Sequence, residues 1–554
     1  MPQVDFVDVE FVLSPSGAPR PSFGLSLILQ NLTDAQDALM VTRTALVTAA
    51  GWPAELAALG ITAGEPTYTE VQSLFSQTIA PAKGYIGRRG KDIQQVWTIQ
   101  VPAVPADGIY AINVAGAVGT PYSFVAATST QVAVRAGLLA ALAAGSAKFV
   151  AAAGIPAGSI TLTAVAAGVP GLTVTLQSPA SSMTGSVTTG TSVLTVAQVW
   201  EMSIVTAALG VYTLTVGTTT GQTVYTHIAT TGATLTTIRD ALKSLYDATP
   251  SDLFGVTMTS SGGNKGILTA SVSGRPGTVS ITSPSSDATT VVTTANYGIA
   301  DDWAVMIAAQ PDFYEGILNY ATDQELLLSG EFFEAEKRHL LGMQTSDADI
   351  LTSVTTDVFS KLKAKLYLRS FGVQHPTNSE GVCAAWSGNV LTSPAGQVNW
   401  KARALTGFTG RILTAPEAAN LLSKEGSFLE LFAARDQSVM DGAYSFAGRP
   451  IDITRAIDTF RTNVEIALMD LLVNARIVPY SKVGQSMASG AIWGEINRAV
   501  AQGYAIDGTF SVEFPPISSA SDNDRKRGIM PTFVVNGTIQ AGTYTIRVRG
   551  SLAQ

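Results

Sequence analysis

The two ends of the chain each alternate apolar and polar residues, which is the period of a β-strand. Near the N-terminus the alternation runs through residues 4–13, with acidic side chains on the polar face; its members are Val7, Val9, Phe11 and Leu13 on one face, and Asp8 and Glu10 on the other. Near the C-terminus it runs through residues 542–550, with arginines on the polar face; its members are Tyr544, Ile546 and Val548 on one face, and Thr543, Thr545, Arg547 and Arg549 on the other. Both segments are predicted to be strands.

Terminal strands either complete their own sheet or extend to the sheet of a neighbour, because an unpaired edge is a template for pairing. Opposite charges on facing strands favour the pairing. We hypothesise that the N-terminal strand of one subunit pairs with the C-terminal strand of another. The alternative, in which both are edge strands within one subunit, stays open.

An internal repeat lies between the two ends. The segments 108–176 and 210–281 align in order. The matched positions are Tyr110 with Tyr212, Arg135 with Arg239, and the Pro170-Gly171 turn with the Pro276-Gly277 turn. Each copy alternates polarity in two runs, changes to helical spacing, and then alternates again. The pattern predicts two tandem α+β modules, each with the order strand, strand, helix, strand, strand (ββαββ).

The sequence on either side of the repeat has more charge and longer helical patterns. Strand-like runs at 314–321, 340–347 and 367–375 alternate with helical runs at 323–338 and 349–365. This alternation is typical of an α/β core, in which a mixed, largely parallel sheet is flanked by helices. The predicted organisation is an N-terminal exchange strand at 1–20, a discontinuous core formed by 21–105 with 297–535, inserted modules at 106–196 and 197–296, and a C-terminal exchange strand at 536–554.

Two helix starts are predicted from capping-box patterns. Thr414 is followed by Pro416 and Glu417, and Thr462 is followed by Glu465. In this motif the two side chains satisfy backbone N–H groups that have no partner inside the helix.

The composition points to an assembled protein. Of 554 residues, 46% are hydrophobic and only 14% are charged, so much of the surface is either uncharged or covered by other subunits. The net charge of -8 argues against binding to nucleic acid, which requires clustered cations. The N-terminal residues lack a signal-peptide pattern, and the apolar stretch 138–155 is interrupted by Lys148, so we expect no export and no membrane insertion.

The residues that usually carry chemistry are sparse and scattered. His227, His339 and His375 have no partners at metal-ligand spacing, so neither a metal nor another cofactor is expected. His227 is interpreted as a strand residue, and His339 as a basic residue at a helix end. Cys383 lies in an apolar run and is expected to be a buried free thiol.

Two basic clusters were considered as sites. The segment 84–91 lacks the glycine spacing of a phosphate loop and is predicted to be a strand followed by a turn, whose cations pair with carboxylates; these are Arg88, Arg89 and Lys91. The segment 523–528 is predicted to be a polar loop between strands. It is either a solvated loop or a patch that binds an acidic neighbouring subunit through Arg525, Lys526 and Arg527.

Three C-terminal segments, 406–422, 447–472 and 490–504, together with the overall organisation, resemble the tail sheath proteins of contractile phages and related injection machines. The resemblance covers roughly the first hundred and the last 250 residues. It implies a structural protein and no enzyme: a homo-oligomer of stacked six-fold rings in a helical polymer around an inner tail tube protein, between baseplate and tail terminator proteins. It also implies assembly in the host cytoplasm, a place in the virion as the tail sheath, and contraction that drives the tube through the host envelope.

Two rival functions remain. The chain could be a baseplate- or fibre-associated adhesin whose repeated modules bind a receptor. It could also be a nucleotide-dependent enzyme, although a fold alone confers no activity.

Overall fold

The computed structural model describes residues 23–540 with gaps. The gaps are 34–35, 37–38, 41, 93, 115–120, 128–129, 144–148, 155–157, 168–173, 180–182, 190–191, 194–198, 219–220, 249–255, 262–264, 271–277, 286–287, 295–296 and 433–436. The alternating segments 4–13 and 542–550 and both Pro-Gly turns therefore lie outside the described residues. Of the predicted C-terminal exchange strand at 536–554, residues 536–540 are described, and Ile539 pairs with Ala505 of the same chain. The chain divides into two compact units, one formed by 1–30, 44–87 and 306–554, and the other by 31–43 and 88–305.

The first unit contains an eight-stranded sheet with the order β2-β3-β1-β20-β21-β22-β23-β24. Its centre is parallel and consists of β1 (Ser26–Gln30), β20 (Glu315–Leu318), β21 (Leu340–Thr345), β22 (Ser370–Gln374) and β23 (Ser427–Phe432). At the edges, β2 (Thr44–Thr48) is antiparallel to β3 (Lys83–Arg88), and β24 (Gln437–Asp441) is antiparallel to β23. Every residue of β1, β20, β21 and β22 is buried, as expected for parallel strands covered on both faces. The prediction of a mixed, largely parallel sheet is confirmed.

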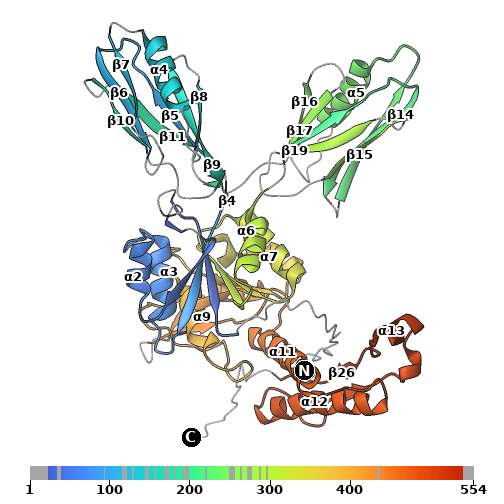
Figure 1. Cartoon of the computed structure of the whole chain (residues 1–554). Coiled ribbons are helices and arrows are strands. Elements are labelled where there is room, and N and C mark those ends of the chain that lie inside the picture. The colour runs from blue at the N-terminus through green and yellow to red at the C-terminus, as the bar shows by residue number, and fades with distance from the viewer. Residues whose placement is uncertain are drawn as a thin grey trace. The chain divides into compact units, whose positions relative to one another are not determined.

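Helices connect and cover these strands (Figure 1). They are α2 (Trp52–Ala58), α3 (Pro66–Phe75), α7 (Asp323–Glu336), α8 (Val358–Ala364), α9 (Val382–Leu391) and α10 (Ala415–Ser423). Helices α3 and α9 contact one another and β1. Gly388 permits this approach, because a Cβ there would lie 2.3 Å from the carbonyl oxygen of Leu74.

Capping decides where several of these helices begin. The capping box of Thr414 and Glu417 is present, as predicted. The second predicted box is wrong, because Thr462 and Glu465 lie inside a 24-residue helix, α11 (Ile451–Asn474), which begins after Pro450. The predicted helix over 349–365 is divided into a 3₁₀ turn (Asp349–Leu351) and α8, whose first turn is capped by the side chain of Asp357.

The last part of the chain, residues 451–540, is called here the C-terminal segment. It contains α11, α12 (Lys482–Ala501), the strands β25 (Ser511–Glu513) and β26 (Val534–Asn536), and α13 (Asp522–Arg527). It has an apolar core of its own, which includes Phe460, Val464, Leu468, Ile492, Ile496 and Tyr504. Among the described residues, no helix is long and apolar enough to cross a membrane.

The repeated segments form two modules with the same arrangement. In the first, the sheets β10-β6-β7 and β11-β5-β9-β8 enclose a core with α4 (Gln131–Ala143); in the second, the sheets β15-β14-β18 and β16-β17-β13-β19 do so with α5 (Leu235–Ala248). The strands of the first are β5 (Gln94–Gln100), β6 (Gly108–Val114), β7 (Tyr122–Ala126), β8 (Phe149–Ala153), β9 (Ser159–Ala167), β10 (Val174–Gln177) and β11 (Thr184–Thr189). Those of the second are β13 (Val199–Ser203), β14 (Gly210–Thr218), β15 (Gly221–Ala229), β16 (Val256–Ser261), β17 (Lys265–Ala270), β18 (Thr278–Thr282) and β19 (Thr289–Thr294).

The matched tyrosines occupy equivalent places in the two modules. Tyr110 and Tyr212 are both fully buried. The Tyr110 hydroxyl donates to the carbonyl oxygen of Ala106 at 3.0 Å, and the Tyr212 hydroxyl lies 3.2 Å from the carbonyl oxygen of Ala208. In both copies the hydroxyl reaches the residue four positions earlier, and Tyr212 also reaches the carbonyl oxygen of Thr206 at 3.0 Å, so the repeat read from the sequence has similar local structure twice.

The predicted order of four strands and one helix was incomplete. Each module has three further strands, namely β5, β8 and β11 in the first and β13, β16 and β19 in the second. Strand β5 pairs with β9 and β11, so residues 94–100 belong to the first module and not, as expected, to the core. The extra strands complete a second sheet in each module, which supplies the other side of its core.

Each module core is expected to be sensitive to truncation by itself. Leu138 on α4 and Leu242 on α5 are both fully buried, so Leu→Ala at either should destabilise its own module by about 2–5 kcal/mol. Hydrogen exchange of the full chain would show faster exchange confined to the altered module.

The control is Leu245→Ala on α5, which is 39% exposed and should have a much smaller effect. Equal acceleration in both modules after one substitution would contradict separate cores.

Candidate functional site

The predicted site residues fall into two groups. The ten residues proposed for strand exchange lie outside the described residues; they are Val7, Asp8, Val9, Glu10, Phe11, Tyr544, Ile546, Arg547, Val548 and Arg549. The basic cluster Arg525, Lys526 and Arg527 is described and lies on α13, between β25 and β26. It is therefore a short helix and not the loop that was predicted.

The helix α13 is exposed and internally capped. Ser521 accepts a hydrogen bond from the backbone of Asp524, and Gly528 ends the helix with a positive φ of 72°. Arg525 pairs with Asp522 at 3.2 Å within the helix itself. No residue of α13 is buried, so the side chains of Lys526 and Arg527 are exposed, as is that of Arg525, which pairs with Asp522.

The C-terminal segment also exposes several large apolar side chains. Eight large apolar side chains of its described residues are more than a third exposed, and they are Ile466, Leu472, Val473, Ile477, Val483, Trp493, Ile506 and Ile529. Strands β25 and β26 form a two-stranded antiparallel sheet. This short sheet packs against α12 and places Val535 in the core of the segment, and among the described strands neither β25 nor β26 has a second strand partner.

Buried charges attach this segment to the eight-stranded sheet. The carboxylate of Asp458 on α11 accepts hydrogen bonds from both terminal guanidinium nitrogens of Arg369, with Nη2 at 2.9 Å from Oδ1. The Tyr314 hydroxyl donates to the same carboxylate at 2.7 Å. Burial raises the pKa of Asp458, while Arg369 opposes that rise. This bidentate ion pair fixes the orientation of α11 as well as its position.

Arg455, one turn before Asp458, makes a second attachment. Its guanidinium donates to four backbone carbonyl oxygens at 2.7–3.1 Å, which belong to Phe23, Val390, Leu391 and Ser393. Two of them are orphan carbonyls at the end of α9, so the arginine acts as a C-terminal cap supplied by another helix. Burial lowers the pKa of Arg455 to about 10, and it stays charged at neutral pH.

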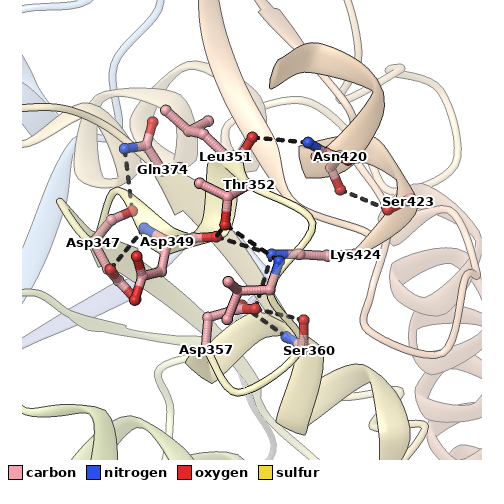
Figure 2. A network of polar contacts seen from close by, with 11 residues as sticks. Asp347, Asp349, Leu351, Thr352, Asp357, Ser360, Gln374, Asn420, Ser423 and Lys424 are labelled. Atoms are coloured by element: carbon pink, nitrogen blue, oxygen red, sulfur yellow. Dashed lines mark hydrogen bonds and ion pairs between the residues drawn. The ribbon is translucent and has the colours of Figure 1, made fainter. Parts of the chain in front are cut away.

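The carboxyl ends of parallel strands are where α/β enzymes place their ligand sites. Here those loops carry a polar network that is closed on itself (Figure 2). Lys424 pairs with Asp357 at 2.8 Å and donates to the carbonyl oxygen of Asp349 at 3.1 Å. Burial tends to raise the pKa of Asp357, but hydrogen bonds from Lys424 and Ser360 lower it further. The network ties loops together.

The turn after β3 behaves as predicted for Arg89. Its Nε lies 3.4 Å from Oδ2 of Asp302, and both side chains are buried. The backbone N–H of Gly90 and the Tyr297 hydroxyl also donate to Asp302, at 2.9 and 2.7 Å. The side chain of Lys91 lies outside the described residues. The glycine-rich turn thus binds the first turn of α6 (Ile299–Ala309).

The histidines and the cysteine lie in a strand, after a helix or in the core, and contact protein groups there. His227 is a strand residue of β15, as predicted. His339 follows α7 and its Nδ1 lies 2.9 Å from Glu336, while His375 contacts the carbonyl oxygen of Thr377. Cys383 is a buried free thiol, as predicted. Across the described residues, no group of three or more potential ligands could hold a metal ion.

No family model and no curated protein matches the sequence. Solved structures of tail sheaths are similar. A sheath tail protein from Listeria innocua has 9% identity and a TM-score of 0.41, covering 95% of this chain and 93% of that one. One from Desulfitobacterium hafniense has 7% identity and a TM-score of 0.40, covering 92% and 93%.

The sheath of an extracellular contractile injection system in its contracted state has 12% identity and a TM-score of 0.36, covering 47% of this chain and 76% of that one. The class of proteins that the sequence resembles is therefore also the class whose solved structures are similar to this chain.

Removing the ion pair between Asp458 and Arg369 should lower the free energy of unfolding. Asp458→Ala leaves the Arg369 guanidinium buried without its carboxylate, which is expected to destabilise the first unit by about 3–5 kcal/mol. Urea unfolding followed by tryptophan fluorescence measures this.

The control is Asp470→Ala, an exposed aspartate on the same helix, which should change stability by less than about 0.5 kcal/mol. A loss at Asp458 no larger than at Asp470 would show that the ion pair does not secure α11.

Proposed function

We propose that this chain is the structural subunit of a contractile tail sheath, which polymerises as stacked rings around an inner tube and contracts to drive the tube through a host envelope. The observation that carries the proposal is the C-terminal segment, where exposed apolar side chains, a short two-stranded sheet and an exposed basic helix come from one stretch of chain. Covering exposed apolar side chains with a partner surface is energetically favourable.

The terminal strands are the proposed links between subunits. The acidic strand at 4–13 and the basic strand at 542–550 have complementary polar faces. We place their pairing beside β25 and β26, because these strands pair only with one another among the described strands. Strands added from other subunits would extend the two-stranded sheet of β25 and β26 and would connect the copies by backbone hydrogen bonds.

In this proposal the remaining parts have structural tasks. The α/β core of each subunit is the rigid body of a ring, the two modules are insertions that face outward, and neither part has an enzymatic role. The polar network around Lys424 is consistent with this, since Lys424 pairs with Asp357 and donates to the backbone carbonyl oxygen of Asp349. The partners are copies of the same chain, the tube, and the baseplate and terminator proteins at the two ends of the sheath.

The charge complementarity can be tested by exchange. Arg547→Glu with Arg549→Glu should abolish tubes seen by negative-stain electron microscopy, because like charges then face one another. Adding Asp8→Arg and Glu10→Arg to the same chain should restore them. The proposal of strand pairing is wrong if the first variant forms normal tubes.

Deleting the terminal strands tests the same connections between subunits without introducing new charges. Removing residues 1–15 or 540–554 should leave a folded monomer by circular dichroism and size-exclusion chromatography, with no tubes. Discrete small oligomers from the intact chain would instead favour an adhesin with receptor-binding modules.

The basic helix α13 should contribute to the rate of assembly. Replacing Arg525, Lys526 and Arg527 together by Glu is expected to slow polymerisation at low salt, measured by light scattering, and to remove most of its salt dependence. Lys365→Glu, an exposed position of the α/β core, is the control and should assemble normally. An unchanged rate for the triple variant would make α13 a solvated helix only.

A further inference from the structure

Two glutamates are buried where α3 and α9 meet the sheet. Glu70 of α3 is 1% exposed and Glu315 of β20 is fully buried. Oε1 of Glu315 accepts a hydrogen bond from the Ser387 hydroxyl at 2.7 Å, but its Oε2 has no donor among the described residues. Neither carboxyl oxygen of Glu70 accepts a hydrogen bond of full geometry from the described residues, although the amides of Gln30 and Asn319 face it. Buried carboxylates without such partners are strongly disfavoured, so the protonated form is stabilised.

The surroundings of Glu315 do not supply a neutralising ion pair. It faces Ser387 and Cys383 from α9, and Arg455 from α11. The terminal nitrogens of Arg455 are already bound to backbone carbonyl oxygens. Burial therefore dominates and raises the pKa of Glu315 to about 8, although Ser387 and Arg455 oppose the rise.

No cation of the described residues acts on Glu70. Glu70 faces the amides of Gln30 and Asn319, the hydroxyl of Tyr320 and the thiol of Cys383. Burial raises the pKa of Glu70 to about 7, and the two amides oppose the rise. Around neutral pH both carboxyl groups thus lie near the point at which they lose a proton.

Glu70 and Glu315 both lie near Cys383 of α9, so they belong to the same packed region between α3, α9 and the sheet. Burial raises the pKa of the Cys383 thiol well above its usual value, and negative charge on Glu315 or Glu70 raises it further. A Cβ on Gly342 of β21 would meet both Cys383 Sγ at 2.8 Å and Glu315 Oε1 at 2.9 Å, so strand, thiol and carboxyl group are closely packed. Charge on either glutamate would have to be accommodated here, where no cation is paired with it.

We propose that Glu70 and Glu315 are a proton-dependent latch, which holds α3 and α9 against the sheet while both carboxyl groups are protonated and loosens that packing when they ionise. Both pKa values lie above the 4.5 of an exposed glutamate. Their contribution is therefore favourable below pH 4.5 and is lost as the pH rises through about 7 and about 8. The core should become easier to open as the pH rises from about 4.5 to about 8.

Cys383 is the chain's only cysteine, so its labelling by a thiol reagent measures this opening directly. Rates are divided by those of the urea-unfolded chain at the same pH, which removes the intrinsic reactivity of the thiol. For the subunit in solution, the corrected rate is expected to rise at least about tenfold between pH 6 and pH 8, since one ionising group contributes up to about tenfold per pH unit.

The variants distinguish the latch from a general effect of pH. Glu70→Gln with Glu315→Gln should make the corrected rate nearly independent of pH, and each single variant should keep part of the dependence. Glu331→Gln, an exposed position on α7, should behave as the unaltered chain does.

The same rise in rate with pH in the double variant as in the unaltered chain would overturn the proposal, as would a flat rate in the unaltered chain. If the double variant does not fold, the single variants and the urea midpoint of the unaltered chain decide. A midpoint that does not fall between pH 6 and pH 8.5 would also overturn the latch. The result does not depend on tube formation, so it stands apart from the proposed function.

Discussion

The ion pair between Arg369 and Asp458 is the interaction on which the placement of the C-terminal segment depends. A buried ion pair adds little net stability, because desolvation offsets most of the attraction, but it permits only one geometry. Here the geometry is reinforced by Tyr314 and, one turn away, by the four carbonyl oxygens bound to Arg455. Helix α11 is continuous over 24 residues, or roughly 36 Å, so one end is held by the sheet while the other belongs to a second apolar core. A subunit whose interfaces rearrange needs such a stiff connection.

The polar groups buried elsewhere in the α/β core follow the same logic. Lys424, at the end of α10 before β23, binds Asp357, which caps α8 in the connection after β21. In the second unit, Arg89 and Asp302 join the turn after β3 to α6. Each of these pairs is satisfied inside the protein. Glu70 and Glu315 differ, because among the described residues neither carboxyl group forms an ion pair, and Arg455 beside Glu315 is bound to backbone carbonyl oxygens instead. In the proposed latch, this makes them the part of the core that responds to protons.

Much of the architecture was predictable from local patterns. The parallel centre of the sheet followed from strand and helix runs of distinct period, and the capping box at Thr414 followed from its side-chain chemistry. The box predicted at Thr462 was wrong because the same residue pattern occurs inside α11, where Phe460 and Val464 are buried and the helix continues through. The missed strands of the modules were not visible because strands such as β8, with the sequence FVAAA, lack strict alternation. The alternating segments 4–13 and 542–550 of the predicted exchange strands lie outside the described residues, and their pairing remains a prediction.

The sequence by itself determined the repeat, the α/β character of the core, the buried thiol and the charge of the two ends, because each depends on residue type and spacing over a short stretch. Only the tertiary structure decided which charges meet. Asp458 and Arg369 are 89 positions apart, and Ser387 and Glu315 are 72 apart. Nothing in their local sequence distinguishes them from solvated side chains, since burial and partnership arise only when distant elements pack together.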